Sequence, residues 1–119
     1  MIVAALLLTL VSSLDGRALV GDWTGAWKST SGSTGSLTIT IDAVEGEQVF
    51  GSFYMAVAAP DTQGYYNRTL QFRGFFDGAV LRIYVPPGLS FEITVAPRLM
   101  RGAVQGQHTF GTVELIRKP

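Results

Sequence analysis

The segment Ser36-Leu37-Thr38-Ile39-Thr40-Ile41-Asp42 alternates strictly between polar and apolar residues. Successive side chains of a β-strand point to opposite faces, so this pattern predicts a strand with one face in a core and the other in water. The segment Leu89-Ser90-Phe91-Glu92-Ile93-Thr94-Val95 has the same pattern. These two segments predict a sheet that is covered on one face only.

Six further segments alternate less strictly, and the chain keeps no helical period from Leu19 onward. They run over residues 19–28, 49–56, 68–76, 79–85, 99–105 and 111–117. Together the eight segments have a spacing of about twelve residues per strand and turn, which is typical of a sandwich or a barrel. Glu45-Gly46, Asp77-Gly78 and Pro86-Pro87-Gly88 supply tight-turn chemistry between them.

Short turns between consecutive strands favour an up-and-down meander over a Greek key. Glycines inside the strands, at positions 51, 74, 102 and 111, allow the sharp coiling that a small closed barrel needs. Closure also removes the exposed edges of so apolar a sheet. The sequence therefore predicts an all-β fold, an eight-stranded antiparallel up-and-down barrel, with a β-sandwich as the alternative.

Composition limits the class of protein. The 119 residues suffice for one domain, and the charged fraction of 15% is low against about 25% in an average globular protein. Lys plus Arg and Asp plus Glu are 9 each, which argues against nucleic acid as a partner. The absence of cysteine excludes disulfides, thiolate metal sites and cysteine nucleophiles.

The first eleven residues are an almost entirely apolar run, followed by Ser12-Ser13. This run is too short to cross a bilayer and has the length of a signal-peptide hydrophobic region. We expect a signal peptide over residues 1–18, a single barrel domain over 19–119, no membrane span in the mature chain, and a secreted or periplasmic protein. Cleavage follows either Gly16-Arg17-Ala18, which we prefer, or Val11-Ser12-Ser13; the alternative to export is an apolar helix packed on the domain.

Two short motifs lie at the ends of the predicted barrel. The first predicted strand contains Gly21-Asp22-Trp23, and the last ends at Arg117. In an eight-stranded meander the last strand ends where the first begins, so closure brings Arg117 beside Trp23. This pair of motifs resembles the signature of the calycin superfamily of lipocalins, fatty-acid-binding proteins and avidins. The resemblance implies that Trp23 plugs one end of the barrel and that Arg117 packs across its ring.

The chain departs from the ligand-binding calycins in its interior. Its only other tryptophan is Trp27, and nearly every predicted inward position holds Leu, Ile, Val, Phe or Gly. An eight-stranded barrel is just wide enough to be filled by its own side chains or to hold one small ligand. We expect the interior to be packed rather than deeply hollow, filled largely by Phe53, Phe72, Phe76 and Phe91.

Little in the sequence points to catalysis. His108 is the only histidine and lies in a predicted turn, which argues against imidazole metal sites and a histidine base. No pair of acidic residues is placed by spacing for acid–base work. The stretch 31–36 lacks the lysine and following helix of a phosphate loop, and is interpreted as a flexible hairpin loop. We therefore expect no enzyme activity, no cofactor and no metal.

Topology indicates where binding would take place. If Trp23 marks the closed end, the connections 29–35, 57–65, 86–88 and 105–109 lie at the opposite end. Aromatic residues with polar tips are frequent in recognition surfaces. The candidate ligand-binding residues at this rim are Trp27, Tyr65, Tyr66, Tyr84 and His108. The alternative is that these residues only complete the packing of the barrel at that end.

The sequence therefore favours an exported, non-catalytic binding module that uses the loops at the barrel mouth. Its expected partner is a small apolar molecule or a protein. The alternative is a periplasmic protein-directed inhibitor or assembly factor, a comparison that rests on the fold alone.

Overall fold

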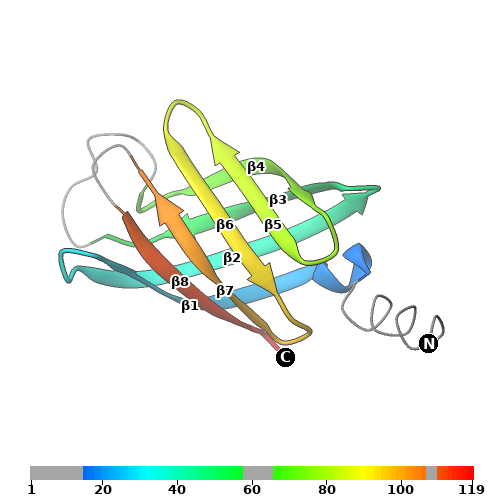
Figure 1. Ribbon diagram of the computed structural model, residues 1–119, viewed down its shortest axis with the longest axis horizontal. Helices are drawn as coiled ribbons and strands as arrows, with labels where there is room; N and C mark the ends of the chain where they lie inside the picture. Colours follow the sequence, from blue (N-terminus) through cyan, green and yellow to red (C-terminus); the bar gives the residue numbers. More distant parts are fainter. Residues whose placement is uncertain (1–14, 58–65, 107–109) are drawn as a thin grey trace, which may run out of the picture.

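Eight strands close into an antiparallel barrel in the computed structural model, which describes residues 15–57, 66–106 and 110–119 (Figure 1). Each strand pairs with its neighbours in sequence, and the first also pairs with the last. This closure confirms the predicted up-and-down barrel and excludes the sandwich. The strands are β1 (Gly21–Ser29), β2 (Thr34–Glu45), β3 (Gln48–Met55), β4 (Thr69–Phe76), β5 (Val80–Val85), β6 (Leu89–Val95), β7 (Leu99–Gln105) and β8 (Phe110–Arg117).

The core is built from the inward members of the alternating segments. In β6, for example, Leu89, Phe91, Ile93 and Val95 are buried, whereas Glu92 is exposed. At the centre of the barrel, the ring centroid of Phe53 lies 5.4 Å from that of Phe91 and 6.4 Å from that of Phe72. Side chains thus occupy the middle of the barrel, and any space for a ligand is restricted to its ends.

The first strand begins later than the sequence predicts. Leu19 ends a single turn of 3-10 helix, η1 (Gly16–Leu19), which the Asp15 carboxylate caps by accepting a hydrogen bond of 3.0 Å from the Arg17 amide. Gly21, with φ of 131°, then turns the chain into β1. The prediction that Leu19 starts the first strand is therefore wrong, because the fully buried Leu19 side chain packs as part of a cap instead.

The second strand is longer than predicted because it contains a bulge. Its pairing with β3 shifts between Ile41 and Ala43, so Asp42 is the extra residue. A bulge moves the following side chains to the opposite face, which is why the strict alternation ends at Asp42 although the strand continues to Glu45.

One contact cluster seals the end of the barrel at which β1 begins. Trp23 is fully buried, and its Nε1 donates a hydrogen bond of 2.9 Å to the carbonyl oxygen of Leu19. The Arg117 guanidinium lies 5.0 Å from the centroid of the Trp23 ring. The same guanidinium donates to the carbonyl oxygens of Ala18, at 2.5 Å, and Val20, at 2.7 Å. Arg117, at the end of the last strand, therefore contacts both Trp23 and the segment that contains η1.

The seam between β1 and β8 also requires glycine. The two strands pair from Trp23 opposite Arg117 to Ser29 opposite Gly111. A Cβ atom at Gly25 would overlap the carbonyl oxygen of Glu114 in β8. Glycine at this position thus permits the close approach of the two strands that close the barrel.

We expect the Trp23–Arg117 contact to appear as a coupling free energy. Trp23→Ala should lower the free energy of unfolding by about 3–5 kcal/mol, as for other buried large aromatics. Arg117→Ala should lower it by about 1–2 kcal/mol, through lost stacking and lost packing of the alkyl stem. In urea unfolding, the double variant should be less destabilised than the sum of the single variants by at least about 0.5 kcal/mol. Strict additivity would contradict the contact.

Candidate functional site

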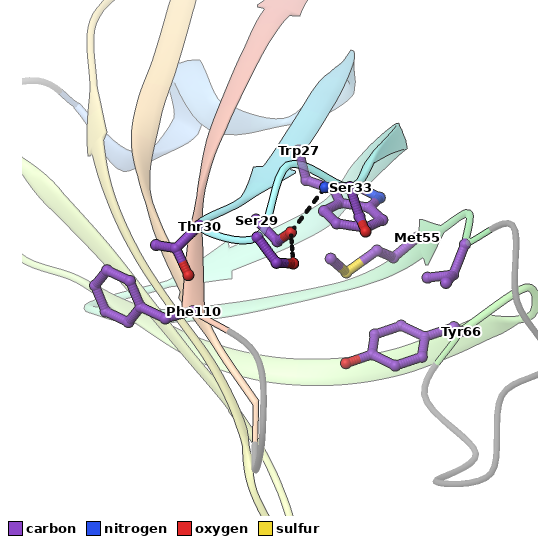
Figure 2. Close-up of a pocket in the computed structure, with 9 residues that line it drawn as sticks. Trp27, Ser29, Thr30, Ser33, Met55, Tyr66 and Phe110 are labelled. Atoms are coloured by element: carbon purple, nitrogen blue, oxygen red, sulfur yellow. Dashed lines mark hydrogen bonds between the residues drawn. The ribbon is translucent and has the colours of Figure 1, made fainter.

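A pocket of about 190 Å³ opens at the end of the barrel opposite Trp23 (Figure 2). Its walls come from the end of β1, the β1–β2 turn, the end of β3 and the start of β8. The lining residues are Trp27, Ser29, Thr30, Ser31, Ser33, Met55, Val57, Tyr66 and Phe110. Within the part of the chain that the structure describes, none of these residues carries a charged side chain.

The indole of Trp27 forms the best-anchored wall of this pocket. Its Nε1 donates a hydrogen bond of 2.7 Å to the carbonyl oxygen of Ala56, just beyond β3, and only 4% of the residue is exposed. Gly35 lies opposite Trp27 in the β1–β2 pairing, and a Cβ atom there would overlap the indole ring. The glycine therefore allows the indole to lie flat across β2 and to reach the carbonyl of Ala56.

Serine hydroxyls form a second wall. Ser29 is inward-facing and 6% exposed, and its Oγ accepts a hydrogen bond of 3.1 Å from the Ser33 amide. The Oγ atoms of Ser29 and Ser31 are hydrogen-bonded at 2.8 Å, and Figure 2 shows both bonds at the pocket wall. The Ser29 amide also donates to the carbonyl oxygen of Ser33, at 2.8 Å. These bonds define the expected hairpin turn, which is shorter than the predicted 31–36 because β2 already begins at Thr34.

Aromatic and apolar side chains complete the pocket. Met55, the last inward residue of β3, is almost fully buried. Figure 2 shows the Tyr66 ring extending toward the interior of the pocket, on the side of Met55 away from the serines. Phe110 lies at the rim and is 53% exposed. In Figure 2, Met55 and Tyr66 lie on one side of the serine hydroxyls, and Phe110 lies on the other, beside Thr30.

Charged groups lie elsewhere in the described residues. No group of three or more His, Cys, Asp or Glu among them could hold a metal ion. The N–H groups of Val80 and Ala79 donate to the Asp77 carboxylate and lower its pKa, with a smaller contribution from Arg82. Asp77 lies in the β4–β5 turn, at the end of the barrel away from the pocket. In the described ranges, no helix is both long and apolar enough to cross a membrane.

The structure brings together only part of the candidate set. Trp27 and Tyr66 both line the pocket. Tyr84 does not, because the inward residues of β5 are Leu81 and Ile83, and Tyr84 therefore points outward. It is 58% exposed, and its hydroxyl donates a 2.9 Å hydrogen bond to the carbonyl oxygen of Pro87. Tyr65 and His108 lie outside the described residues.

Most of the pocket residues were not named as candidates from the sequence, although the connections 29–35 and 57–65 were placed at this end of the barrel. A signal for one of them was present: Ser29 follows Trp23 and Trp27 at the inward positions of β1, where a polar residue stands out. Phe110 precedes the predicted last strand and gives no such signal. The residues missed are Ser29, Thr30, Ser31, Ser33, Met55, Val57 and Phe110.

Comparison with known proteins establishes the fold. No family model and no curated protein matches this chain. A redesigned β-barrel is similar at 12% sequence identity and a TM-score of 0.63, over 87% of this chain and 94% of that one. A de novo designed fluorescence-activating β-barrel is similar at 14% identity and a TM-score of 0.59, over 86% and 95%. The chain is thus an eight-stranded antiparallel barrel with a small pocket at one end.

We expect Trp27→Phe to reveal how firmly the pocket wall is held. The substitution keeps the aromatic ring but removes the donor to the carbonyl oxygen of Ala56. Loss of a partly buried hydrogen bond should lower the free energy of unfolding by about 1–3 kcal/mol, measured by urea unfolding followed by Trp23 fluorescence. Thr30→Ala, at an exposed rim position, should change it by no more than about 0.5 kcal/mol. Equal stability of Trp27→Phe and the parent would argue against the bond.

Proposed function

We propose that this chain is an exported, non-catalytic binding module that holds a small uncharged molecule in the pocket at the barrel mouth. The observation that carries the proposal is that two buried, anchored side chains, the Trp27 indole and the Ser29 hydroxyl, lie next to each other in the lining of one pocket. Ligand sites in proteins are typically concave and apolar, with a few fixed polar groups that orient the ligand.

The size and chemistry of the pocket support a ligand of one or two rings. Its volume of about 190 Å³ is below the range of about 300–1,000 Å³ for drug-sized ligands. It is of the order of a cavity of about 150 Å³ that takes up benzene. Since no described lining residue is charged, a charged ligand would lose its hydration without gaining an opposite charge. The hydroxyl groups in the lining favour a ligand that can form hydrogen bonds.

We also propose that the barrel is calycin-like. Support comes from the Gly21-x-Trp23 motif on β1 and from Arg117 on β8, whose guanidinium lies over the Trp23 ring. In this proposal the closed end is architectural, and binding is left to the opposite end.

Phenol and benzoate distinguish the expected ligand class, because they have similar size and differ in charge. Phenol should raise the Tm in a dose-dependent way, by linkage, and a concentration of about 100 times the Kd corresponds to about 2.7 kcal/mol. Benzoate should give no shift, because its carboxylate would be desolvated without a cationic partner. A benzoate shift as large as that of phenol would contradict a site for neutral ligands.

Two phenylalanines of equal exposure provide a matched control for that titration. Phe110 and Phe75 are both 53% exposed, but only Phe110 lines the pocket. Phe110→Ala should weaken phenol binding about three- to tenfold through loss of a ring contact. Phe75→Ala should leave the Kd unchanged. Equal losses in the two variants would place phenol outside the pocket.

The contacts of η1 bear on the proposed export. Of the two cleavage sites, the one after Ser13 leaves η1 on the mature chain, whereas the one after Ala18 removes most of it. The carbonyl oxygen of Ala18 accepts a hydrogen bond from Arg117, and Gly16 packs against Val44. We therefore propose that the signal peptide ends at Ser13 and that η1 belongs to the mature domain.

Sequencing the N-terminus of exported protein checks this proposal, and the expected first residue is Leu14. A chain that begins at Leu19 should also be less stable to urea than one that begins at Leu14, by about 1 kcal/mol, because Arg117 loses a carbonyl partner. Exported material that begins at Met1 would contradict the signal peptide. Material that begins at Leu19 would exclude η1 from the mature domain.

A further inference from the structure

The wall of the barrel is incompletely paired between β4 and β5. These strands share three residue pairs, from Phe76 opposite Leu81 to Gly74 opposite Ile83. By contrast, β3 and β4 share seven pairs, and β5 and β6 share six. The pairing stops at Gly74, so residues 69–73 of β4 have no ladder to β5 on the side toward the mouth. We call this region the open seam.

The direction of the backbone groups at the open seam follows from two hydrogen bonds. The Phe76 amide donates to the carbonyl oxygen of Glu47, so the even-numbered residues of β4 pair with β3 and the odd-numbered ones face β5. The Val95 amide donates to the carbonyl oxygen of Ala79, so the even-numbered residues of β5 face β4. Gly74 and Ile83 are therefore a non-hydrogen-bonded pair, and the ladder ends on the bond that follows it, from the Tyr84 amide to the Arg73 carbonyl oxygen. Beyond that bond, the Arg73 N–H and the Tyr84 carbonyl oxygen face the open seam.

Proline accounts for the end of the ladder on one side. Continued in register, the pairing would place Pro86 opposite Gln71. Proline has no N–H to donate, and Pro87 follows directly, so β5 cannot extend the ladder toward the mouth. The main-chain groups of Gln71 are thus left facing the open seam from β4.

The side chains of the open seam form a groove on the outer wall. It is lined by Gln71, Phe72, Arg73, Phe75, Tyr84, Val85 and Pro86. Phe72 is largely buried, whereas Phe75 and Tyr84 are exposed. Among the described residues no carboxylate forms an ion pair with Arg73, whereas Arg82 lies within 4 Å of both Asp77 and Glu92.

We propose that the open seam binds an extended peptide segment of a partner protein by strand addition, and that this segment alternates apolar and acidic residues. Unpaired main-chain groups in an extended strand are satisfied best by another strand. A residue of the added strand opposite Phe72 points inward and is apolar. The neighbouring residue, opposite Gln71, points outward, where its carboxylate reaches the guanidinium of Arg73 diagonally. This site is independent of the mouth pocket.

A short synthetic peptide tests the proposal. The probe is N-acetylated, C-amidated Val-Glu-Val-Glu-Val, which has the same residue order in both strand orientations. Titrated into the ¹⁵N-labelled domain, it should shift the amide signals of Gln71, Arg73 and Tyr84, with a Kd of about 1 mM or tighter. A Val-Lys-Val-Lys-Val peptide should bind more weakly. Arg73→Glu should weaken the glutamate peptide about two- to fivefold and strengthen the lysine peptide.

Backbone methylation separates strand addition from side-chain adsorption. One peptide is methylated on the main-chain nitrogens of its valines, and another on the main-chain nitrogens of its glutamates. Alternate residues of a strand direct their N–H groups to opposite edges, so each peptide lacks the hydrogen-bond donors of one edge. At least one of them should bind about tenfold more weakly than the parent. Three outcomes would overturn the proposal: both methylated peptides bind like the parent, the shifts fall on the mouth pocket instead, or about 10 mM peptide produces no shift.

Discussion

The contact between Arg117 and Trp23 is the constraint on which the rest of this barrel depends. It joins residues near the two ends of the domain, and its guanidinium also binds the carbonyl oxygens of Ala18 and Val20. An eight-stranded meander that did not close would expose two apolar edges. With β1 and β8 paired, every backbone edge is covered except at the open seam between β4 and β5 in the described part of the chain.

The same strand that seals one end of the barrel also builds the pocket at the other. Inward positions recur at every second residue of β1, so Trp23 at the closed end leads to Trp27 and Ser29 at the mouth. Between the two ends, the rings of Phe53, Phe72 and Phe91 fill the interior. The packed middle explains why the pocket is small, because the pocket extends only from the rim to the side chains of Trp27 and Met55.

The two candidate binding surfaces differ in chemistry because they use different parts of the strand. The mouth pocket uses inward side chains and a hydrogen-bonded turn, and its described lining carries no charge. The open seam presents main-chain groups of β4 and β5 together with the exposed Arg73. A small neutral molecule suits the first surface, and an extended acidic segment suits the second. The two sites also lie on different strands, so variants can address them separately.

The sequence alone determined the local order of this protein. Alternation identified the eight strands, and in the two strictly alternating segments it also identified the inward residues, because one face of such a strand is in the core and the other is in water. The end motifs identified Trp23 and Arg117 as neighbours, since strand number and antiparallel order place them at one end. For the pocket, sequence predicted Trp27 and Tyr66 but not the serine wall, and it placed outward-facing Tyr84 with them.

Only the tertiary structure decided where strands stop pairing and which residues meet around the circumference. The bulge at Asp42, the start of β1 at Gly21 and the short ladder between β4 and β5 all depend on the geometry of a neighbouring strand. The contact between Trp27 and Ala56 crosses an intervening strand and needs a glycine at position 35. Alternation along one strand carries no information about such contacts, because it encodes the face to which a side chain points and not the partner that it finds there.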